Sequence, residues 1–174
     1  FNGSVSLLQI RKQNALTTDP VDPDYSVQTG EVTVRGIEIE GAWQVNDALS
    51  IQGGYAYMDS EITKSNDGDE GAQLGDTPEN QANLFVRYQT PIEGLELRGG
   101  VNYVGEALLV NASSIVIPDY TIAELGAAYK IGKVRIDATL TNLFDERYYT
   151  ASGGSLSVLP GDPRAFNVRV GYQF

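Results

Sequence analysis

The sequence of 174 residues contains no cysteine and no histidine. The absence of cysteine excludes a disulfide framework and thiolate chemistry. The absence of histidine removes the side chain that most often serves as a general base or a metal ligand. Glu38 and Glu40 share one face of a predicted strand, but no nucleophile and base accompany them. We therefore expect no catalytic residues, no resident metal and no cofactor.

Long hydrophobic runs and positive charge are also scarce. No segment approaches the run of about 18 apolar residues that a membrane-spanning helix needs. The 12 lysine and arginine residues are outnumbered by 23 acidic residues, which gives a net charge of −11. This charge argues against nucleic acid as a partner, because such proteins carry a basic footprint.

Alternation of apolar and polar residues dominates instead of helical periodicity. Period-two alternation is typical of β-strands with two different faces. The pattern predicts an all-β, antiparallel up-and-down meander of about eight strands. It is clear in "LSIQGGYAY", "NQANLFVRYQT", "LELRGGVNYVG", "KVRIDATLTN" and residues 166–174, and weaker near 1–12, 32–45 and 120–131.

The connections between these segments alternate in length. Three are short, at 45–48, 90–94 and 130–133. Four are long and polar, at 13–31, 59–80, 104–119 and 146–164. Short turns at one end and long loops at the other are typical of bacterial outer-membrane barrels.

The two faces of the strands differ in composition. One face is rich in tyrosine and aliphatic residues, and the other carries charged and amide side chains with glycine between them. A soluble β-sandwich would also alternate, so the loop polarity decides for the membrane. We expect the tyrosines near strand ends to form girdles at the two membrane interfaces: Tyr55, Tyr57, Tyr88, Tyr103, Tyr129 and Tyr172.

The segment "EVTVRGIEIEGAW" breaks the alternation, because its apolar residues change face between Val34 and Ile37. A bulge near Gly36 would explain the change. The alternative, which we favour, is that the first half of the segment projects beyond the bilayer, where both faces are wet.

Several motifs resemble one known family. "TLTNLFDERYY" followed by "PGDPRAFNVRVGYQF" resembles the C-terminal end of TonB-dependent outer-membrane receptors of the ferric-siderophore type. "VRGIEIEGAW", "LSIQGGYAYMDSEI" and "NYVGE" resemble earlier strands of the same barrels. The resemblance implies that residues 1–174 are the C-terminal portion of a larger barrel in the cell outer membrane, with its plug domain absent.

The resemblance also implies a function and partners. A receptor of this family binds a ferric siderophore at its extracellular loops and is energised by TonB through the plug. Membership of this family is also compatible with other cargo, such as cobalamin or glycans. Lipid would contact the apolar face, and the acidic loop 64–76 could bridge to lipopolysaccharide through divalent ions, although a solvated loop is the simpler reading.

The last strand resembles the signal that the barrel-assembly machinery recognises. That signal consists of alternate apolar residues and a closing aromatic residue, which here are Phe166, Val168, Val170, Tyr172 and Phe174. A free strand edge with an apolar face can add to another sheet, which gives such recognition a physical basis. The same residues would serve as lipid-facing side chains in the finished wall.

Residues near the loops are candidates for binding or structural roles. We expect ligand contacts in 59–80, 104–119 and 146–160, with Tyr148 and Tyr149 as candidates. We expect Asn142 and Asp145 to end a strand through bonds to the backbone. Charged residues of the polar face should form ion pairs, and the arginine candidates are Arg98, Arg164 and Arg169.

A second hypothesis is a self-contained small outer-membrane barrel with a structural or adhesive role. About eight strands can close on themselves. In that case residues 166–174 would pair with residues 1–10, whereas a segment of a larger barrel forms an open sheet.

Overall fold

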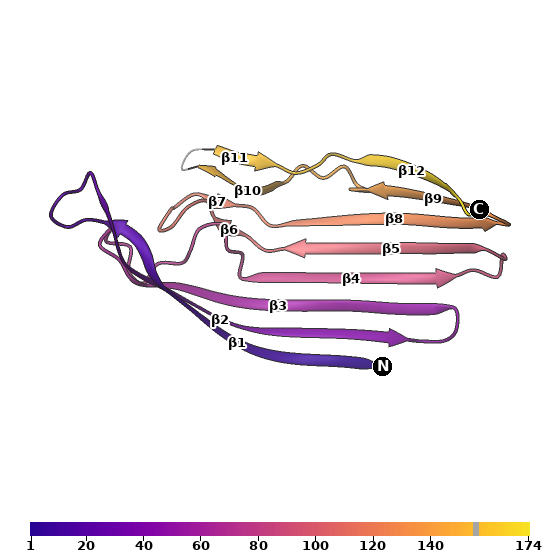
Figure 1. Cartoon of the computed structure of the whole chain (residues 1–174), viewed down its shortest axis with the longest axis horizontal. Coiled ribbons are helices and arrows are strands. Elements are labelled where there is room, and N and C mark those ends of the chain that lie inside the picture. Colours follow the sequence, from indigo (N-terminus) through magenta and orange to yellow (C-terminus); the bar gives the residue numbers. More distant parts are fainter. Residues whose placement is uncertain (155–156) are drawn as a thin grey trace.

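The computed structural model describes residues 1–154 and 157–174, and its main feature is one antiparallel sheet of eight strands (Figure 1). Neighbours follow the order β1-β2-β3-β4-β5-β8-β9-β12. The strands are β1 (Asn2–Thr18), β2 (Ser26–Gln44), β3 (Leu49–Lys64), β4 (Asn80–Gln89), β5 (Leu95–Val104), β8 (Tyr120–Ile131), β9 (Val134–Thr141) and β12 (Ala165–Tyr172). Two small ribbons pair β6 (Ala107–Leu108) with β7 (Val116–Ile117) and β10 (Tyr149–Gly154) with β11 (Ser157–Pro160).

The sheet is open, as we expected of a segment of a larger barrel. β1 pairs with β2 and β12 pairs with β9, so these two strands form the opposite edges (Figure 1). The alternative of a small closed barrel is not what the structure shows. Within residues 1–154 and 157–174, no helix has the length and apolar character to cross a membrane.

The three short turns lie at one end of the sheet and the long connections at the other, as predicted (Figure 1). The long connections contain more strand than the sequence indicated. β1 continues to Thr18, β2 begins at Ser26 and β3 runs to Lys64. The remaining two long connections contain the β6–β7 and β10–β11 ribbons. The hairpin ladder continues where the sequence turns polar, because backbone pairing does not depend on an apolar face.

The apolar residues of β2 change face near Gly36 without any bulge in the strand. Gly36 pairs in continuous register with Leu8 and Met58, so the proposed bulge there is wrong. The register shifts lie farther out, next to Ala15 and between Glu31 and Val32. β1, β2 and β3 have 17, 19 and 16 residues, whereas about 9–11 suffice to span a membrane. These lengths agree with an extension beyond the bilayer.

A polar row marks where the extension begins. Gln9, Arg35 and Asp59 are register partners on three neighbouring strands. They lie on the same face as the apolar row Leu7–Ile37–Tyr57 and one step farther toward the loop end. A charged row on the face that is apolar elsewhere is expected just outside the hydrocarbon layer.

The apolar residues of the other strands form continuous rows on one face. One row joins Tyr88, Leu97, Ala127, Ala138 and Val168 across five strands. Leu97 is 43% and Val168 55% exposed, so no second layer of this chain covers them. We call this side the apolar face and the opposite side the polar face. Among the described residues, these rows form no dry interior of the kind that a soluble sandwich requires.

The tyrosines lie near both ends of the apolar face. Tyr55 and Tyr103 flank Ala82 in one row near the loop end, and Tyr57 lies one step farther out. Three others lie near the turn end of their strands: Tyr88, Tyr129 and Tyr172. This arrangement agrees with the predicted aromatic girdles.

Candidate functional site

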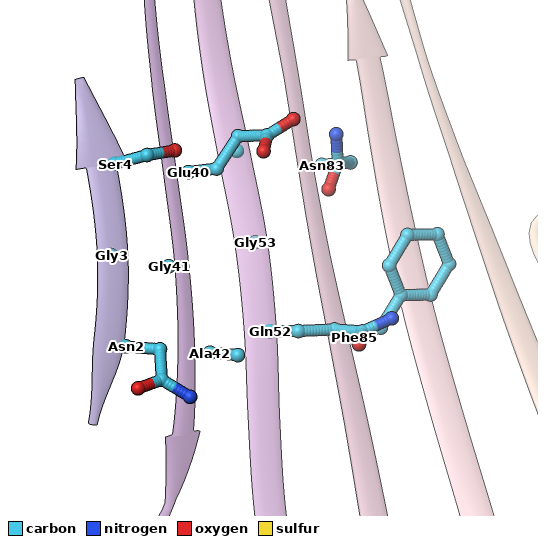
Figure 2. A pocket seen from close by; sticks show the side chains of 11 residues that line it. Asn2, Gly3, Ser4, Glu40, Gly41, Ala42, Gln52, Gly53, Asn83 and Phe85 are labelled. Carbon is cyan, nitrogen blue, oxygen red and sulfur yellow. The ribbon is translucent and has the colours of Figure 1, made fainter.

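The polar face contains a hollow over β1 to β4 (Figure 2). Two rows of register partners line it: Ser4–Glu40–Gly54–Asn83 and Asn2–Ala42–Gln52–Phe85. Its volume is about 490 Å³. Small residues form the floor, while carboxylate and amide groups offer hydrogen bonds, so the surface is suited to binding a polar partner.

Phe85 is the aromatic side chain that interrupts the polar face of β4. A Cβ atom on Gly100 of β5 would lie 2.7 Å from the Phe85 ring. The ring therefore lies directly on the glycine. Phe85 departs from the alternation of β4, and its register partner Gly100 explains how the sheet accommodates the ring.

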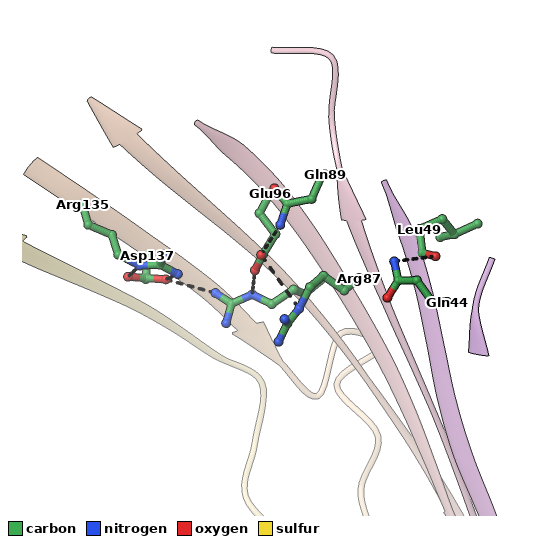
Figure 3. Close-up of polar contacts among 8 residues, drawn as sticks. Gln44, Leu49, Arg87, Gln89, Glu96, Arg135 and Asp137 are labelled. Atoms are coloured by element: carbon green, nitrogen blue, oxygen red, sulfur yellow. Dashed lines mark hydrogen bonds and ion pairs between the residues drawn. The ribbon is translucent and has the colours of Figure 1, made fainter. Parts of the chain in front are cut away.

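An ionic network crosses the polar face near the turn end (Figure 3). Arg98 Nη2 lies 3.2 Å from Asp137 Oδ1, and Arg135 binds both oxygens of Asp137 at 2.9 Å. Glu96 accepts a hydrogen bond from Gln89 at 2.6 Å and lies 3.6 Å from Arg98 Nε. These side chains thus join β5 to β9, although β8 lies between the two strands in the sheet.

The predicted arginine pairs form in two of three cases. Arg98 pairs with Glu96 and Asp137, and Arg164 lies 3.8 Å from Asp145. Arg169 is the register partner of Asp137, which places it beside the same network.

Asn142 organises the start of the last long connection. Its side chain is 3% exposed and donates to the carbonyls of Glu146 and Asp162 at 2.9 and 3.0 Å. Its Oδ1 accepts from the Glu146 amide at 2.8 Å. Asp145 accepts from the Arg164 amide at 3.1 Å. The predicted side-chain-to-backbone bonds are confirmed, and they tie the two ends of this connection together.

The two candidate tyrosines have different surroundings. The Tyr148 ring is 4.5 Å from the Tyr120 ring by centroid and lies against Gly161, so packing occupies much of it. Tyr149 begins β10, pairs with Pro160 and is 43% exposed. Both lie at the loop end, as expected. Of the predicted contact range 146–160, residues 155 and 156 lie outside the described residues.

The residues of the expected assembly signal all lie on the apolar face or continue it. Four are register partners of apolar residues in β9, and Phe174 packs edge-on against Tyr172 at 5.2 Å. All five are exposed, with Phe174 fully so: Phe166, Val168, Val170, Tyr172 and Phe174. The other edge of β12 has no partner strand among the described residues.

Glu31 is a buried carboxylate that lies at the centre of a polar cluster in the extension, which the sequence did not reveal. It is 5% exposed, and its carboxylate lies 2.7 Å from Arg11 and 3.0 Å from the Thr63 hydroxyl. Gln13 donates to it at 3.3 Å. The hydrogen bond from Arg11 lowers the pKa of Glu31 to about 2. Its partners come from the two neighbouring strands, β1 and β3, and no local spacing rule brings them together.

An apolar face with two tyrosine girdles, a polar face and long loops at one end define the wall of a transmembrane β-barrel. The family that matches residues 1–143 is described as "TonB dependent receptor-like, beta-barrel". The chain belongs to this family, and its place is the outer membrane.

Similar proteins include two receptors and one solved structure. The metal-pseudopaline receptor CntO of Pseudomonas aeruginosa is 32% identical over 166 residues, which cover 92% of this chain and 23% of that protein. The ferrioxamine receptor of Yersinia enterocolitica is 28% identical over 169 residues, covering 93% and 24%. The crystal structure of BauA, the ferric preacinetobactin receptor of Acinetobacter baumannii, has a TM-score of 0.84 at 27% identity, covering 99% and 27%.

The chain spans about a quarter of the length of these relatives. All three are named as receptors, none as an enzyme, in agreement with the prediction of a non-enzymatic chain.

Proposed function

We propose that residues 1–174 form the C-terminal part of the barrel of a TonB-dependent receptor that imports a ferric siderophore across the outer membrane. The main support is that relatives named for metal or iron chelates match more than nine-tenths of the chain. The membrane-type wall adds to this support, because it offers a polar face toward a lumen and long loops at one end.

Iron would arrive as cargo inside its chelator, so the wall needs no metal ligands of its own. Capture would occur at the loop end, where Tyr149 is the more accessible of the two candidate tyrosines. TonB would act through a plug domain in the rest of the receptor, and the polar face would border that lumen. Loop-end carboxylates would meet lipopolysaccharide, while the apolar face contacts lipid.

During assembly, β12 would present its alternate apolar residues to the barrel-assembly machinery. Its free edge would then pair with a strand from elsewhere in the receptor, which removes the exposed edge. The support for this role is the exposure of Phe166, Val168, Val170, Tyr172 and Phe174 on one side of an edge strand.

The full-length receptor containing this sequence can be tested for iron uptake in a host without its own siderophore receptors. The probes are ferrioxamine B, ferric preacinetobactin and ferrichrome, each loaded with radioactive iron. We expect one of them to accumulate in a tonB-positive host and not in a matched strain without TonB. Accumulation that is equal in both strains, or none of any probe by a correctly assembled barrel, would refute the proposal.

A further inference from the structure

Three loop-end segments contact one another in series. They are the tip of hairpin β1–β2 (residues 18–29), the connection 65–79 between β3 and β4, and the connection 105–119 between β5 and β8. Together we call them the loop cap. Connection 65–79 lies between the other two and contacts both, through one joint on each side.

The first joint links the hairpin tip to connection 65–79. The Thr18 amide donates to Asp67 Oδ1 at 3.0 Å. Asn66 Nδ2 donates to the Thr18 carbonyl at 3.0 Å and to the Thr29 hydroxyl at 3.1 Å. Asn66 therefore contacts both strands of the hairpin, and it makes both contacts as a donor through its side-chain amide nitrogen.

The second joint links connections 65–79 and 105–119. The Gly75 amide donates to Asn111 Oδ1 at 2.9 Å, and the Asp76 amide donates to the Leu108 carbonyl at 2.8 Å. A Cβ atom on Gly75 would lie 2.5 Å from the Val110 Cα. The two backbones thus touch, and at this joint the side chain of Asn111 supplies an acceptor.

Apolar burial supports the cap as a packed unit. Among the described residues, the buried apolar side chains are Ile62, Leu109, Ile117 and Ala128. The first three lie at the loop end. Ile62 also exchanges backbone hydrogen bonds with connection 65–79, through Gly71 and Ala72 at 2.9 Å each. In a sheet whose faces are otherwise open, these three apolar side chains are buried at the loop end.

We propose that Asn66 and Asn111 are positioning residues that hold the loop cap as one coupled unit. Because the joints are in series, loosening connection 105–119 should loosen the hairpin tip two contacts away. This coupling rests on the contacts alone. Its use, that a chelate ordering one loop orders the other two, rests on the proposed function.

The test is site-resolved amide hydrogen exchange on the ligand-free, full-length receptor in detergent micelles. In Asn111→Ala, we expect exchange at Gly75 to rise about five-fold, as for a lost hydrogen bond. Exchange at Thr18 should rise with it. The matched control is Ser113→Ala, which removes a 2.9 Å bond to the Ile115 amide within the same connection. That control should leave Thr18 unchanged.

The chemistry of each joint gives a sharper second test. Asn111→Asp keeps the acceptor oxygen and should restore protection at Thr18. Asn66→Asp loses the amide donor and should behave like Asn66→Ala. Because coupling is reciprocal, Asn66→Ala must also raise exchange at Gly75.

Exchange that rises at Gly75 but not at Thr18 in Asn111→Ala would overturn the proposal, as would equal behaviour of the two Asp variants. Gly75→Ala provides a further check, since its Cβ would press on the backbone of Val110 and Asn111 while both asparagine side chains stay in place. It should also raise exchange at Thr18. Coupling that is found in a receptor without TonB-dependent uptake would refute the proposed function and leave this inference standing.

Discussion

Arg98 on β5 and Asp137 on β9 form an ion pair of 3.2 Å across β8, the strand that lies between them. β8 presents Gly126 as the register partner of Arg98 and Ala128 as that of Asp137. Arg98 Nε lies 3.5 Å from the position of a Cβ on Gly126. Small residues on β8 thus give the arginine a path over the strand.

We expect Gly126→Leu to separate Arg98 from Asp137 and to lower the stability of the barrel. The pair is partly exposed, so its loss should change the unfolding equilibrium by up to about five-fold. Gly126→Ala should behave like the unmodified protein, because its methyl group would make an ordinary contact. Urea unfolding at low and high salt provides the measurement. If both variants behave alike, the side chain of residue 126 does not control the pair.

Val168→Asp should prevent assembly of the full-length barrel. Val168 lies in the middle of β12 on the apolar face. A lipid-facing Arg or Lys near the bilayer centre costs about 2–4 kcal/mol and an Asp somewhat less, which is still a large penalty for an edge strand. Arg169→Ala, on the polar face of the same strand, should be much milder. Heat-modifiable gel mobility of outer-membrane fractions separates folded from unfolded barrel. Equal tolerance at the two positions would contradict the assignment of faces.

The alternation of residues predicted most of the sheet, because strand period is a local property that a single sequence displays. The direction of the faces followed from the same pattern. The sequence did not predict that β1 continues to Thr18 or that β2 begins at Ser26, because the mixed polar residues there show no alternation. Pairing with a long neighbouring strand supplies the order that the local pattern does not.

The candidate contacts divide in the same way. Turn chemistry predicted the local bond between Asn142 and the Glu146 amide. It did not predict that Asn142 and Asp145 also bond to the backbone of Asp162 and Arg164, at the far end of the connection. Asn66 and Thr18 are 48 residues apart. Nothing in their local sequence indicates such a contact, because it joins two loop-end segments that lie far apart in the chain.

Asn142→Ala should destabilise the connection between β9 and β12. The substitution leaves the Glu146 amide and two carbonyls without their partner, at a cost of about 1–3 kcal/mol for a buried group. Asn142 also has a φ of 46°, which alanine adopts with strain. Asn142→Gly avoids this strain but still lacks the side-chain hydrogen bonds. Limited proteolysis of residues 142–164 should therefore be faster in both variants and fastest with alanine. Wild-type resistance of the alanine variant would rule out a structural role for this side chain.

The stability of the β1–β3 extension should depend on acid through Glu31. Its pKa is lowered from an ordinary 4.5 to about 2, chiefly by the hydrogen bond from Arg11. A carboxylate with a depressed pKa in the folded state stabilises that state above its unfolded pKa. This contribution should therefore be complete above about pH 4.5 and disappear as the pH falls toward about 2.

Proteolysis of residues 18–29 by an acid-active protease should accelerate across this window in the unmodified receptor. In Glu31→Gln, cleavage should already be faster at the upper end and should change less with pH. Arg11→Gln should also weaken the pH dependence of cleavage, because it removes the charged partner of Glu31. An acid response of normal size in Glu31→Gln would show that another group is responsible.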